Sequence, residues 1–402
     1  MRSIFTRQRR GPPPVAGPPP VASPFSADIR TDPATDQKCC LFKHSILKFV
    51  DENRIVVAGP SGDHLPTPLN GVSVASASST SLTHCKASVD VVGLETSDWN
   101  RIRAEVKNTP GVWVLIGSYV PDNAGHVLGD EVWAVWQALC MFGLQDRPVN
   151  VITDNGLRHR QQYMALTKNP IYSFDELRGK KVSFENLIVG MGRNGYALGH
   201  YHENPSGPIQ GMLPTSGSRI SARAAYLPPF CETFDAFRRH AYRIWGIDES
   251  SSDFRRGKRH VLVLDKDPNA SAHPCRLWDA VGITKEISQI CPDHHVELVN
   301  WNGMGIGEQI RKMSKADAVV SLPGSDLMNC VFMHPRGRII CPARFVGTCK
   351  EGSAEIGIWF QHTHRCVEIR DVSRITQDGC LFSKLNDPTV LRDHLHDIGR
   401  QN

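Results

Sequence analysis

A histidine and an aspartate stand four residues apart in the segment 123–130, which reads NAGHVLGD. Positions four apart share a face of an α-helix, so a helix beginning here would bring His126 and Asp130 together. An imidazole titrates near neutral pH, and a carboxylate beside it can fix its tautomer or accept a proton itself. The pair therefore indicates general-base chemistry. Asn123 is placed to cap the helix or to reach the same site. The plainer interpretation is a capping asparagine, a hydrogen-bonded histidine and a solvated aspartate.

The segment 318–329, which reads AVVSLPGSDLMN, is typical of a strand, a tight turn and the start of a helix. A glycine-containing turn exposes backbone N–H groups, and together with the helix dipole these groups can bind phosphate. We therefore expect Gly324, Ser325 and Asn329 to contact a phosphate-bearing ligand. The alternative is an ordinary turn in which Asp326 caps the helix. The Asp326 carboxylate would also repel a diphosphate unless it faces a sugar hydroxyl or a metal.

Residues 190–195 read GMGRNG and fit the dinucleotide-binding pattern GxGxxG after a strand. The segment that follows lacks helical periodicity. Residues 210–221 contain no acid where the ribose-binding carboxylate is expected. A nicotinamide-dependent oxidoreductase is therefore the least favoured of the functions considered.

Two histidine pairs, His294 with His295 and His362 with His364, could bind a metal ion. Neither pair has a third ligand at the spacing of a metal site, so surface histidines are the better interpretation. The 12 cysteines are scattered without a CxxC pair, which argues against a zinc ribbon and leaves the disulfide state open.

Short apolar runs separated by helical patterns predict the elements that position these residues. Strands are expected at 112–116, 150–153, 187–189, 260–264, 296–299, 318–322 and 339–340, where the set ends. Helices are expected at 127–142, 238–245, 276–288, 307–314 and from residue 327. This alternation predicts an α/β protein with parallel sheets covered on both faces. A polar linker at 248–258 divides it into two lobes, and a ligand would bind in the cleft between them.

The N-terminal residues 1–24 are rich in arginine and proline and contain no acid. They are interpreted as a disordered leader, with an SH3-type ligand and a transit peptide as alternatives. A Ser/Thr-rich linker is expected at 72–83. The expected domains are therefore a tail and linker over 1–84, an N-terminal lobe over 85–247 and a C-terminal lobe with a tail over 248–402. A net charge of +5 is too mild to indicate a nucleic-acid partner, and no apolar stretch is long enough to span a membrane.

Taken together, four segments resemble glycosyltransferase family 61, which includes the O-linked GlcNAc transferases of the secretory pathway and plant xylan-decorating enzymes. The segments are the NxxHxxxD pattern at 123–130, the strand 182–190, the Glu-Gln helix and Ala-Asp pair at 308–317, and the loop and Pro-x-Gly at 321–337. The resemblance covers roughly residues 110–345.

The resemblance implies a GT-B-like fold, in which two Rossmann-like lobes with parallel sheets face a central cleft. It implies an inverting, metal-independent transfer of a sugar from a nucleotide-sugar, most simply a UDP-sugar, to a glycan or glycoprotein in the Golgi or ER lumen. Asp130 or His126 would be the base. The turn at 324–329 and Lys266 would hold the leaving diphosphate on the C-terminal side, and Glu308 would hold the ribose hydroxyls. No metal or other cofactor is expected, and membrane association stays open because no signal anchor is visible.

The loop departs from the family pattern on the donor side. Pro323 stands where a histidine is expected, Asp326 where the second glycine is expected, and Met328 where a threonine is expected. Cys341 stands where an acid usually ends the next strand. These departures favour an alternative, a catalytically degenerate relative that binds a glycan or protein partner without transferring a sugar.

Overall fold

The computed structural model describes residues 25–31, 38–49, 54–61, 88–118, 122–154, 159–190, 230–249, 258–265, 277–322, 324–335, 337–342, 365–369, 372–377 and 380–396. Several predicted features lie outside these residues: the leader at 1–24, the linker at 72–83, positions 191–195 of the GxGxxG pattern, most of the linker at 248–258, Lys266, Pro323, His362 and His364.

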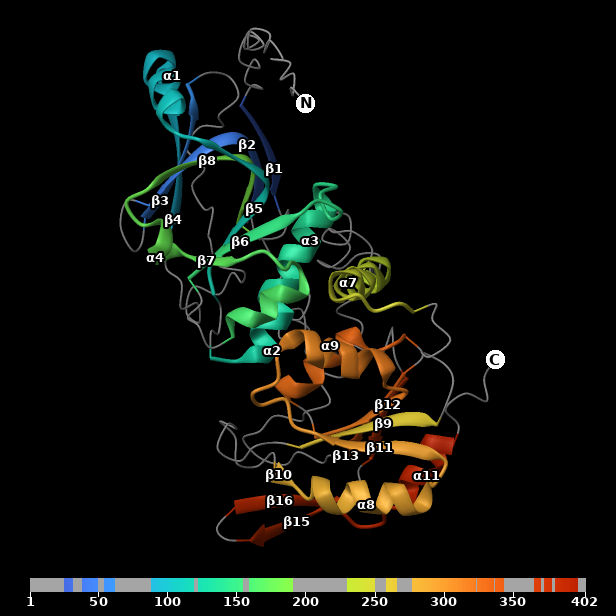
Figure 1. Cartoon of the computed structure of the whole chain (residues 1–402). Coiled ribbons are helices and arrows are strands. Elements are labelled where there is room, and N and C mark those ends of the chain that lie inside the picture. The colour runs from blue at the N-terminus through green and yellow to red at the C-terminus, as the bar shows by residue number, and fades with distance from the viewer. Residues whose placement is uncertain are drawn as a thin grey trace, which may run out of the picture.

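A mixed β-sheet forms the N-terminal half (Figure 1). Its strands run in the order β4-β3-β2-β8-β5-β6-β7, and β1 pairs with β2. Their bounds are Ser26–Thr31 (β1), Lys38–Phe49 (β2), Arg54–Pro60 (β3), Ser88–Leu94 (β4), Asn108–Ile116 (β5), Val149–Thr153 (β6), Ile171–Ser173 (β7) and Lys181–Val189 (β8). The predicted strands β8, β5 and β6 are parallel neighbours, as expected, and the unpredicted β7 pairs in parallel with β6. The expectation of a wholly parallel sheet is wrong, because β2 runs antiparallel to β8, β3 and β1.

The first three strands correct the expected N-terminal boundary, since residues 26–60 were placed in the tail. Strand β2 lies inside the sheet, between β3 and β8. Its residues 39–42 are all buried, as expected for a strand covered on both faces. Lys43 and His44 interrupt the apolar run, and His44 adopts a positive φ of 55°. The strand therefore lacks the continuous or alternating pattern by which the other strands were predicted.

The helix expected at 127–142 is three consecutive helical segments. They are α2 (Ala124–His126), the π-helical turn η1 (Val127–Val132) and α3 (Trp133–Met141). The π-helical turn contains one residue more per hydrogen-bonded loop than an α-helix, and such turns are frequent at functional sites. The predicted apolar face is buried at Leu128, Val132, Trp136 and Leu139. The remaining helices of this half are α1 (Thr96–Glu105), the 3-10 helix η2 (Arg160–Ala165) and α4 (Phe174–Leu177).

A wholly parallel sheet with the order β11-β9-β12-β13-β14 forms the C-terminal half. Its strands are β9 (Arg259–Leu264), β11 (His294–Val299), β12 (Ala318–Val320), β13 (Arg338–Pro342) and β14 (Arg365–Ile369). Helix α9 (Ile306–Lys315) lies on one side of this sheet and α8 (Ala280–Ile290) on the other, as Figure 1 shows. The prediction of a parallel sheet covered on both faces is confirmed for this half.

The set of strands does not end at 339–340 as predicted. Strand β14 extends the parallel sheet, and a separate sheet joins β10 (Leu277–Trp278), β16 (Cys380–Leu385) and β15 (Val372–Gln377). Helix α11 (Val390–His396) follows. The helix expected from residue 327 is a 3-10 helix, η6 (Ser325–Phe332), which begins directly after Gly324.

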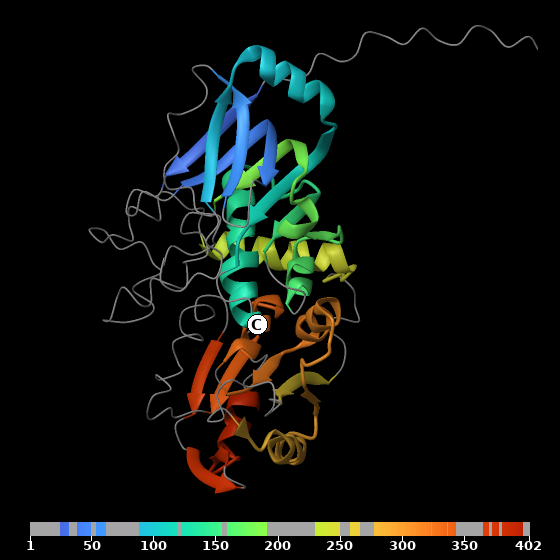
Figure 2. The same cartoon turned by 90° about the vertical axis from the view of Figure 1, so that its left-hand side faces the viewer.

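Helix α7 (Phe230–Trp245) lies between the two sheets, as both views show (Figures 1 and 2). Its Tyr242 hydroxyl donates to the carbonyl of Phe332, and the rings of Phe237 and Phe332 lie 5.8 Å apart. On the other side, Trp245 Nε1 donates to the Met164 carbonyl at 3.1 Å. One buried apolar cluster continues from the α3 side of the N-terminal sheet into the C-terminal sheet. The described residues thus form an α/β structure whose halves share a core.

Among the described residues, no helix combines the length and the apolar composition that crossing a lipid bilayer requires.

Candidate functional site

The two segments selected for their chemistry meet in the structure, although they are far apart in the sequence. The Asn123 side chain accepts two hydrogen bonds at Oδ1. One comes from the Gly125 backbone N–H at 3.0 Å, and the other from the Ser325 hydroxyl at 2.7 Å. Asn123 therefore caps the first helical turn, which is one of its two predicted roles, and it also contacts the glycine-containing turn.

The backbones of α2 and η6 are in close contact at Gly125. A Cβ atom added to Gly125 would lie 2.7 Å from Ser325 Cβ and 2.8 Å from Ser325 Cα. Real Cβ atoms do not approach other carbons this closely, and a backbone cannot yield as a flexible side chain can. The glycine in the NAGH sequence is thus required by the packing of α2 against η6.

The turn before η6 depends on Gly324, which is buried and has φ 151° and ψ −176°. This region of backbone space is open essentially to glycine alone. The chain leaves β12, turns at this glycine, and directs the first residues of η6 toward α2. Asn329 lies within η6 and is 7% exposed, whereas Ser325 and Asp326 are partly exposed.

The structure describes His126 and Asp130 by their backbones only. His126 ends α2, and Asp130 lies in the π-helical turn η1. Both therefore belong to the helical segment whose first turn contacts η6. The predicted donor-side residues are less clustered. Glu308 is exposed in the first turn of α9, a helix that packs against η6, and Lys266 lies outside the described residues.

Sequence reasoning missed Glu131, which follows Asp130 and is fully buried. Its Oε1 accepts a 2.6 Å hydrogen bond from the Ser118 hydroxyl just beyond β5. Its other oxygen, Oε2, accepts one from the Tyr163 hydroxyl of η2. Thr153, the last residue of β6, lies 3.3 Å from the same Tyr163 oxygen. The carboxylate thus ties the π-helical turn to the carboxyl ends of two strands.

The pKa of Tyr163 supports this assignment of donors and acceptors. Burial raises the pKa of the phenol well above its ordinary value, and the charge of Glu131 raises it further. The hydroxyl therefore stays protonated at neutral pH and donates a hydrogen bond to the carboxylate. The signal in the sequence was an acid among the buried positions of an apolar helix, since Leu128 and Val135 flank it at helical spacing.

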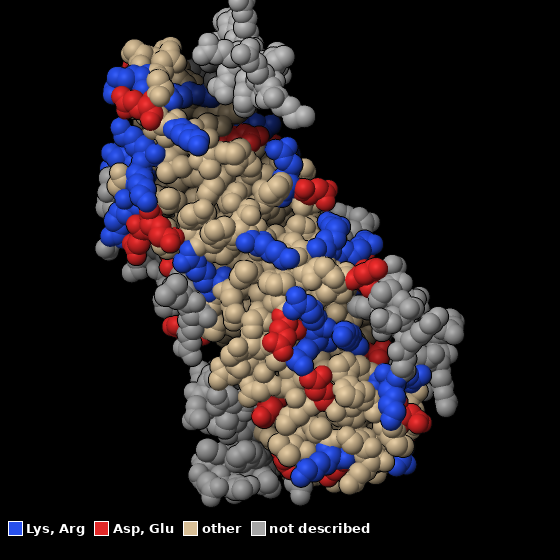
Figure 3. Space-filling model, viewed as in Figure 1, with Lys and Arg blue, Asp and Glu red and all other residues tan. Residues whose placement is uncertain are grey.

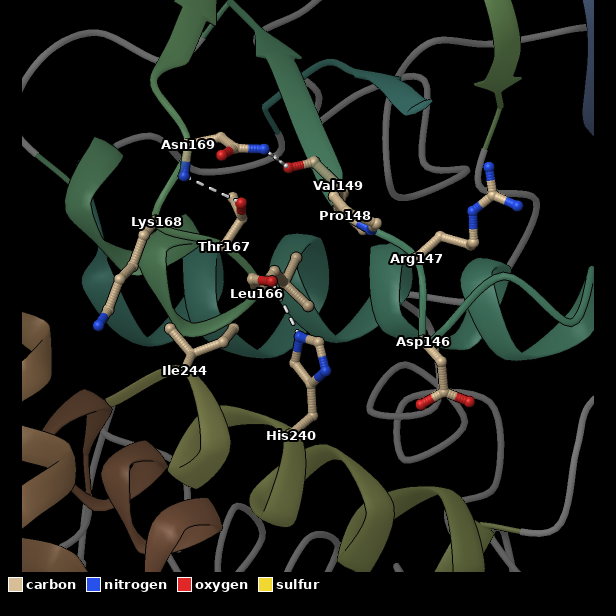
Figure 4. A pocket seen from close by; sticks show the side chains of 10 residues that line it. All are labelled: Asp146, Arg147, Pro148, Val149, Leu166, Thr167, Lys168, Asn169, His240 and Ile244. Carbon is tan, nitrogen blue, oxygen red and sulfur yellow. Dashed lines mark hydrogen bonds between the residues drawn. The ribbon is translucent and has the colours of Figure 1, made fainter. Parts of the chain in front are cut away.

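A pocket of about 280 Å³ lies elsewhere, where residues 146–149 and 166–169 face His240 and Ile244 of α7 (Figure 4). It is at the amino ends of β6 and β7, the edge of the sheet opposite Ser118 and Thr153. His240 Nε2 hydrogen-bonds the Leu166 carbonyl at 2.9 Å. Burial lowers the pKa of His240, so the ring is neutral at pH 7. The pocket is therefore separate from the segments that meet at Ser325.

Charged side chains of both signs are interspersed over the face shown in Figure 3, and they gather closely over α9. Helix α9 has Glu308 near its start and Lys312 and Lys315 in its last turn. These charges interact favourably with the helix dipole, which is positive at the start of the helix and negative at its end. Among the described residues of this face, positive and negative side chains therefore lie close to one another.

A known family model matches part of the C-terminal half. Residues 271–340 match the family model described as Glycosyltransferase 61. The match confirms the resemblance that the motifs predicted, and it supports a glycosyltransferase in general terms. The segment includes the Gly324 turn and η6, while the NAGH segment lies before it. The hydrogen bond from Ser325 to Asn123 thus joins the matched segment to a part of the chain outside it.

Comparisons with curated proteins and with solved structures do not identify a related protein. No curated protein matches the chain. Among solved structures, the metal-soaked Flv1 flavodiiron core from Synechocystis sp. PCC6803 aligns at 8% identity and a TM-score of 0.21, over 86% of this chain and 93% of that one. A TM-score this low does not establish a common fold.

Proposed function

We propose that the protein is an inverting glycosyltransferase that moves a sugar from a nucleotide-sugar to a hydroxyl of a glycan or glycoprotein. The observation that carries the proposal is the contact between Asn123 and Ser325. It joins a segment with a potential base to the first turn of η6, where backbone N–H groups can bind a phosphate. An inverting transfer needs both, because a base must deprotonate the acceptor while the leaving diphosphate is stabilised.

The acceptor side is assigned to the NAGH segment. Asp130 or His126 accepts the proton of the acceptor hydroxyl as its oxygen attacks the anomeric carbon from the face opposite the leaving nucleotide. The buried bonds from Ser118 and Tyr163 to Glu131 support this role indirectly, because they fix the π-helical turn that contains Asp130. Because this backbone is already fixed, less conformational entropy is lost when the base is oriented toward the acceptor hydroxyl.

The donor side is assigned to the turn at 324–329. Backbone N–H groups at the start of η6 and the amide of Asn329 stabilise the negative charge that develops on the diphosphate. Lys266 adds a positive charge and Glu308 binds the ribose hydroxyls. The donor is a UDP-sugar, and neither a metal nor another cofactor takes part in the transfer. The match of the family model to residues 271–340 supports this choice of side.

In this proposal the fold is GT-B-like, with an N-terminal acceptor lobe up to residue 247 and a C-terminal donor lobe from residue 248. Helix α7 and the shared core would then act as the joint between them. Following the family resemblance, the protein acts in the Golgi or ER lumen.

A catalytically degenerate binding protein is the second candidate, and a specific observation favours it. The Ser325 hydroxyl, in the first residue of η6, already donates to Asn123. Pro323, Asp326 and Met328 also depart from the family loop. In this case the same surface would bind a glycan or a protein partner without transferring a sugar.

A donor-cleavage assay with a panel of UDP- and GDP-sugars separates the two candidates. The wild type should cleave at least one donor, and Asp130→Asn and His126→Ala should lower the rate by about a hundredfold or more at the residue that is the base. Cleavage that both variants retain would remove the base assignment. No cleavage of any donor by the wild type would favour the binding protein.

A further inference from the structure

Two histidines and a glutamate gather at the amino edge of the C-terminal sheet, away from the candidate site. The ligand atoms of His260, His295 and Glu297 all lie within 4.8 Å of one another. His260 Nε2 is 3.0 Å from Glu297 Oε2, and the two imidazole centroids are 4.8 Å apart. His295 is exposed and the other two are partly buried, so an ion can reach the cluster from solvent.

The cluster is a consequence of strand register. Strands β9 and β11 are parallel neighbours with His295 opposite His260, so both side chains leave the same face of the sheet. Glu297 follows His295 by two residues and shares that face. His294 leaves the opposite face, where its ring lies 6.1 Å from that of His396. From the sequence, no third ligand was expected near His294 and His295. The neighbouring strand β9 supplies one, His260, and of the pair only His295 belongs to the cluster.

Charges of both signs lie around the cluster. Lys312 of α9 donates to Glu297 Oε1, so the carboxylate already faces a positive group. Asp317 accepts a hydrogen bond from the His260 backbone N–H at 2.8 Å and adds a second negative charge near the ring. A divalent ion would provide twice the charge of the lysine ammonium, and it would compete with Lys312 for the carboxylate.

We propose that His260, His295 and Glu297 bind a divalent transition-metal ion, with Zn²⁺ as the best match. Two imidazole nitrogens and one carboxylate oxygen are a common zinc ligand set, and three protein ligands leave the fourth position to water. Metal–ligand distances of about 2.0–2.1 Å require ligand atoms about 3.3 Å apart. The exposed His295 ring rotates inward to reach this spacing, and Lys312 releases Oε1.

The site is distinct from the proposed transferase chemistry. His260 and His295 lie at the starts of β9 and β11, whereas the Gly324 turn follows the carboxyl end of β12. Because these strands are parallel, the histidine cluster lies at their amino ends and the Gly324 turn lies beyond their carboxyl ends. The bound ion ties β9 to β11 and to nothing in the donor turn. The inference stands whether or not the protein transfers sugars.

Calorimetric titration of the chelator-treated full chain with Zn²⁺ tests the proposal, with Co²⁺ absorption reporting the ligand set. The wild type should bind one more ion than His260→Ala/His295→Ala, or bind it at least tenfold more tightly. His294→Ala, the neighbour on the opposite face, should bind like the wild type. Superimposable isotherms for the wild type and the double variant would overturn the proposal, as would no binding by the wild type.

The variant Lys312→Met tests the role of Glu297 without removing a ligand. Because the ammonium no longer competes, Zn²⁺ affinity should rise severalfold, whereas unchanged or weaker binding would contradict coordination by Glu297. Thermal melting of each variant without metal shows whether it folds. Added Zn²⁺ should raise the Tm of the wild type and Lys312→Met but not that of the double histidine variant. Equal Tm shifts in all three would contradict the site.

Discussion

The Ser325 hydroxyl donates a 2.7 Å hydrogen bond to Asn123 Oδ1 across 202 residues of sequence. Asn123 begins the helical segment that contains His126 and Asp130, and Ser325 begins the 3-10 helix after the Gly324 turn. The bond thus connects the two groups of residues on which the proposed transfer depends. It also shows that the two halves of the chain meet at this point rather than being joined only through α7.

Substitution of Gly125 by alanine should destabilise the contact between α2 and η6. The added methyl would lie 2.7 Å from Ser325 Cβ, so one backbone must move, at a cost of about 1–3 kcal/mol in the free energy of unfolding. Urea unfolding measures this cost. The matched control is Gly305→Ala, since a Cβ there meets no atom within 4 Å and φ is −65°. Equal stability of the two variants would show that the helices do not pack as described.

Removal of the Tyr163 hydroxyl should weaken the network around Glu131. The variant Tyr163→Phe keeps the ring but deletes the donor to a fully buried carboxylate, which costs about 1–3 kcal/mol in the free energy of unfolding. Tyr172→Phe, a partly exposed tyrosine beside Trp113, is the control and should change stability by less than about 0.5 kcal/mol. A loss in Tyr163→Phe no larger than in the control would mean that Glu131 does not depend on this donor.

The buried His240 should make the protein less stable in mild acid. Burial lowers the pKa of the folded-state imidazole below its ordinary value, although the bond to Leu166 opposes the shift. Below about pH 6.5 the unfolded chain therefore binds a proton that the folded chain does not. The free energy of unfolding then falls with falling pH, by at most about 1.4 kcal/mol per unit for this group.

Urea unfolding at pH 7.5 and pH 5.5 checks this sign. The variant His240→Gln should lose less stability between the two pH values than the wild type does, because the titrating group is gone. The exposed His396→Gln serves as the control and should follow the wild type. Parallel losses in all three proteins would contradict the assignment to His240.

The carboxylate of Asp326 should oppose binding of a diphosphate at the donor turn. It is partly exposed in the first turn of η6. Asp326→Asn should therefore strengthen UDP binding by roughly two- to fivefold, which corresponds to about 0.5–1 kcal/mol for an exposed charge. Calorimetry at low and high salt measures the effect, which should shrink as salt screens the charge. Weaker binding by the variant would instead indicate that Asp326 holds a sugar hydroxyl.

The sequence predicted most of the parallel core because its strands are continuous apolar runs. Residues 112–116 and 261–264 are buried, and both segments were identified from their continuous apolar runs. It did not predict β2, where Lys43 and His44 interrupt the run, nor β10, where a helix was expected, nor the strands after residue 342. Strand β10 has only two residues, and residues 365–369 include two charges. Such strands are defined by their neighbours rather than by their own pattern.

The candidate site was predictable in part, for a similar reason. Local spacing identified Asn123 and Ser325 as members of two separate motifs, and only packing brings them into contact. Glu131 was missed because its partners, Ser118 and Tyr163, come from two other elements. The metal ligand His260 was missed because local spacing does not reveal which strands are neighbours, although both histidines begin apolar strands.

The proposed transfer requires a nucleotide-sugar to bind where the Gly324 turn meets the NAGH segment. A crystal structure of the full chain with UDP shows where the nucleotide binds. The diphosphate should lie within hydrogen-bonding distance of backbone N–H groups at 324–329, on the side facing Asn123. UDP in the pocket beside His240, UDP at another surface, or no bound UDP would rule out this donor site.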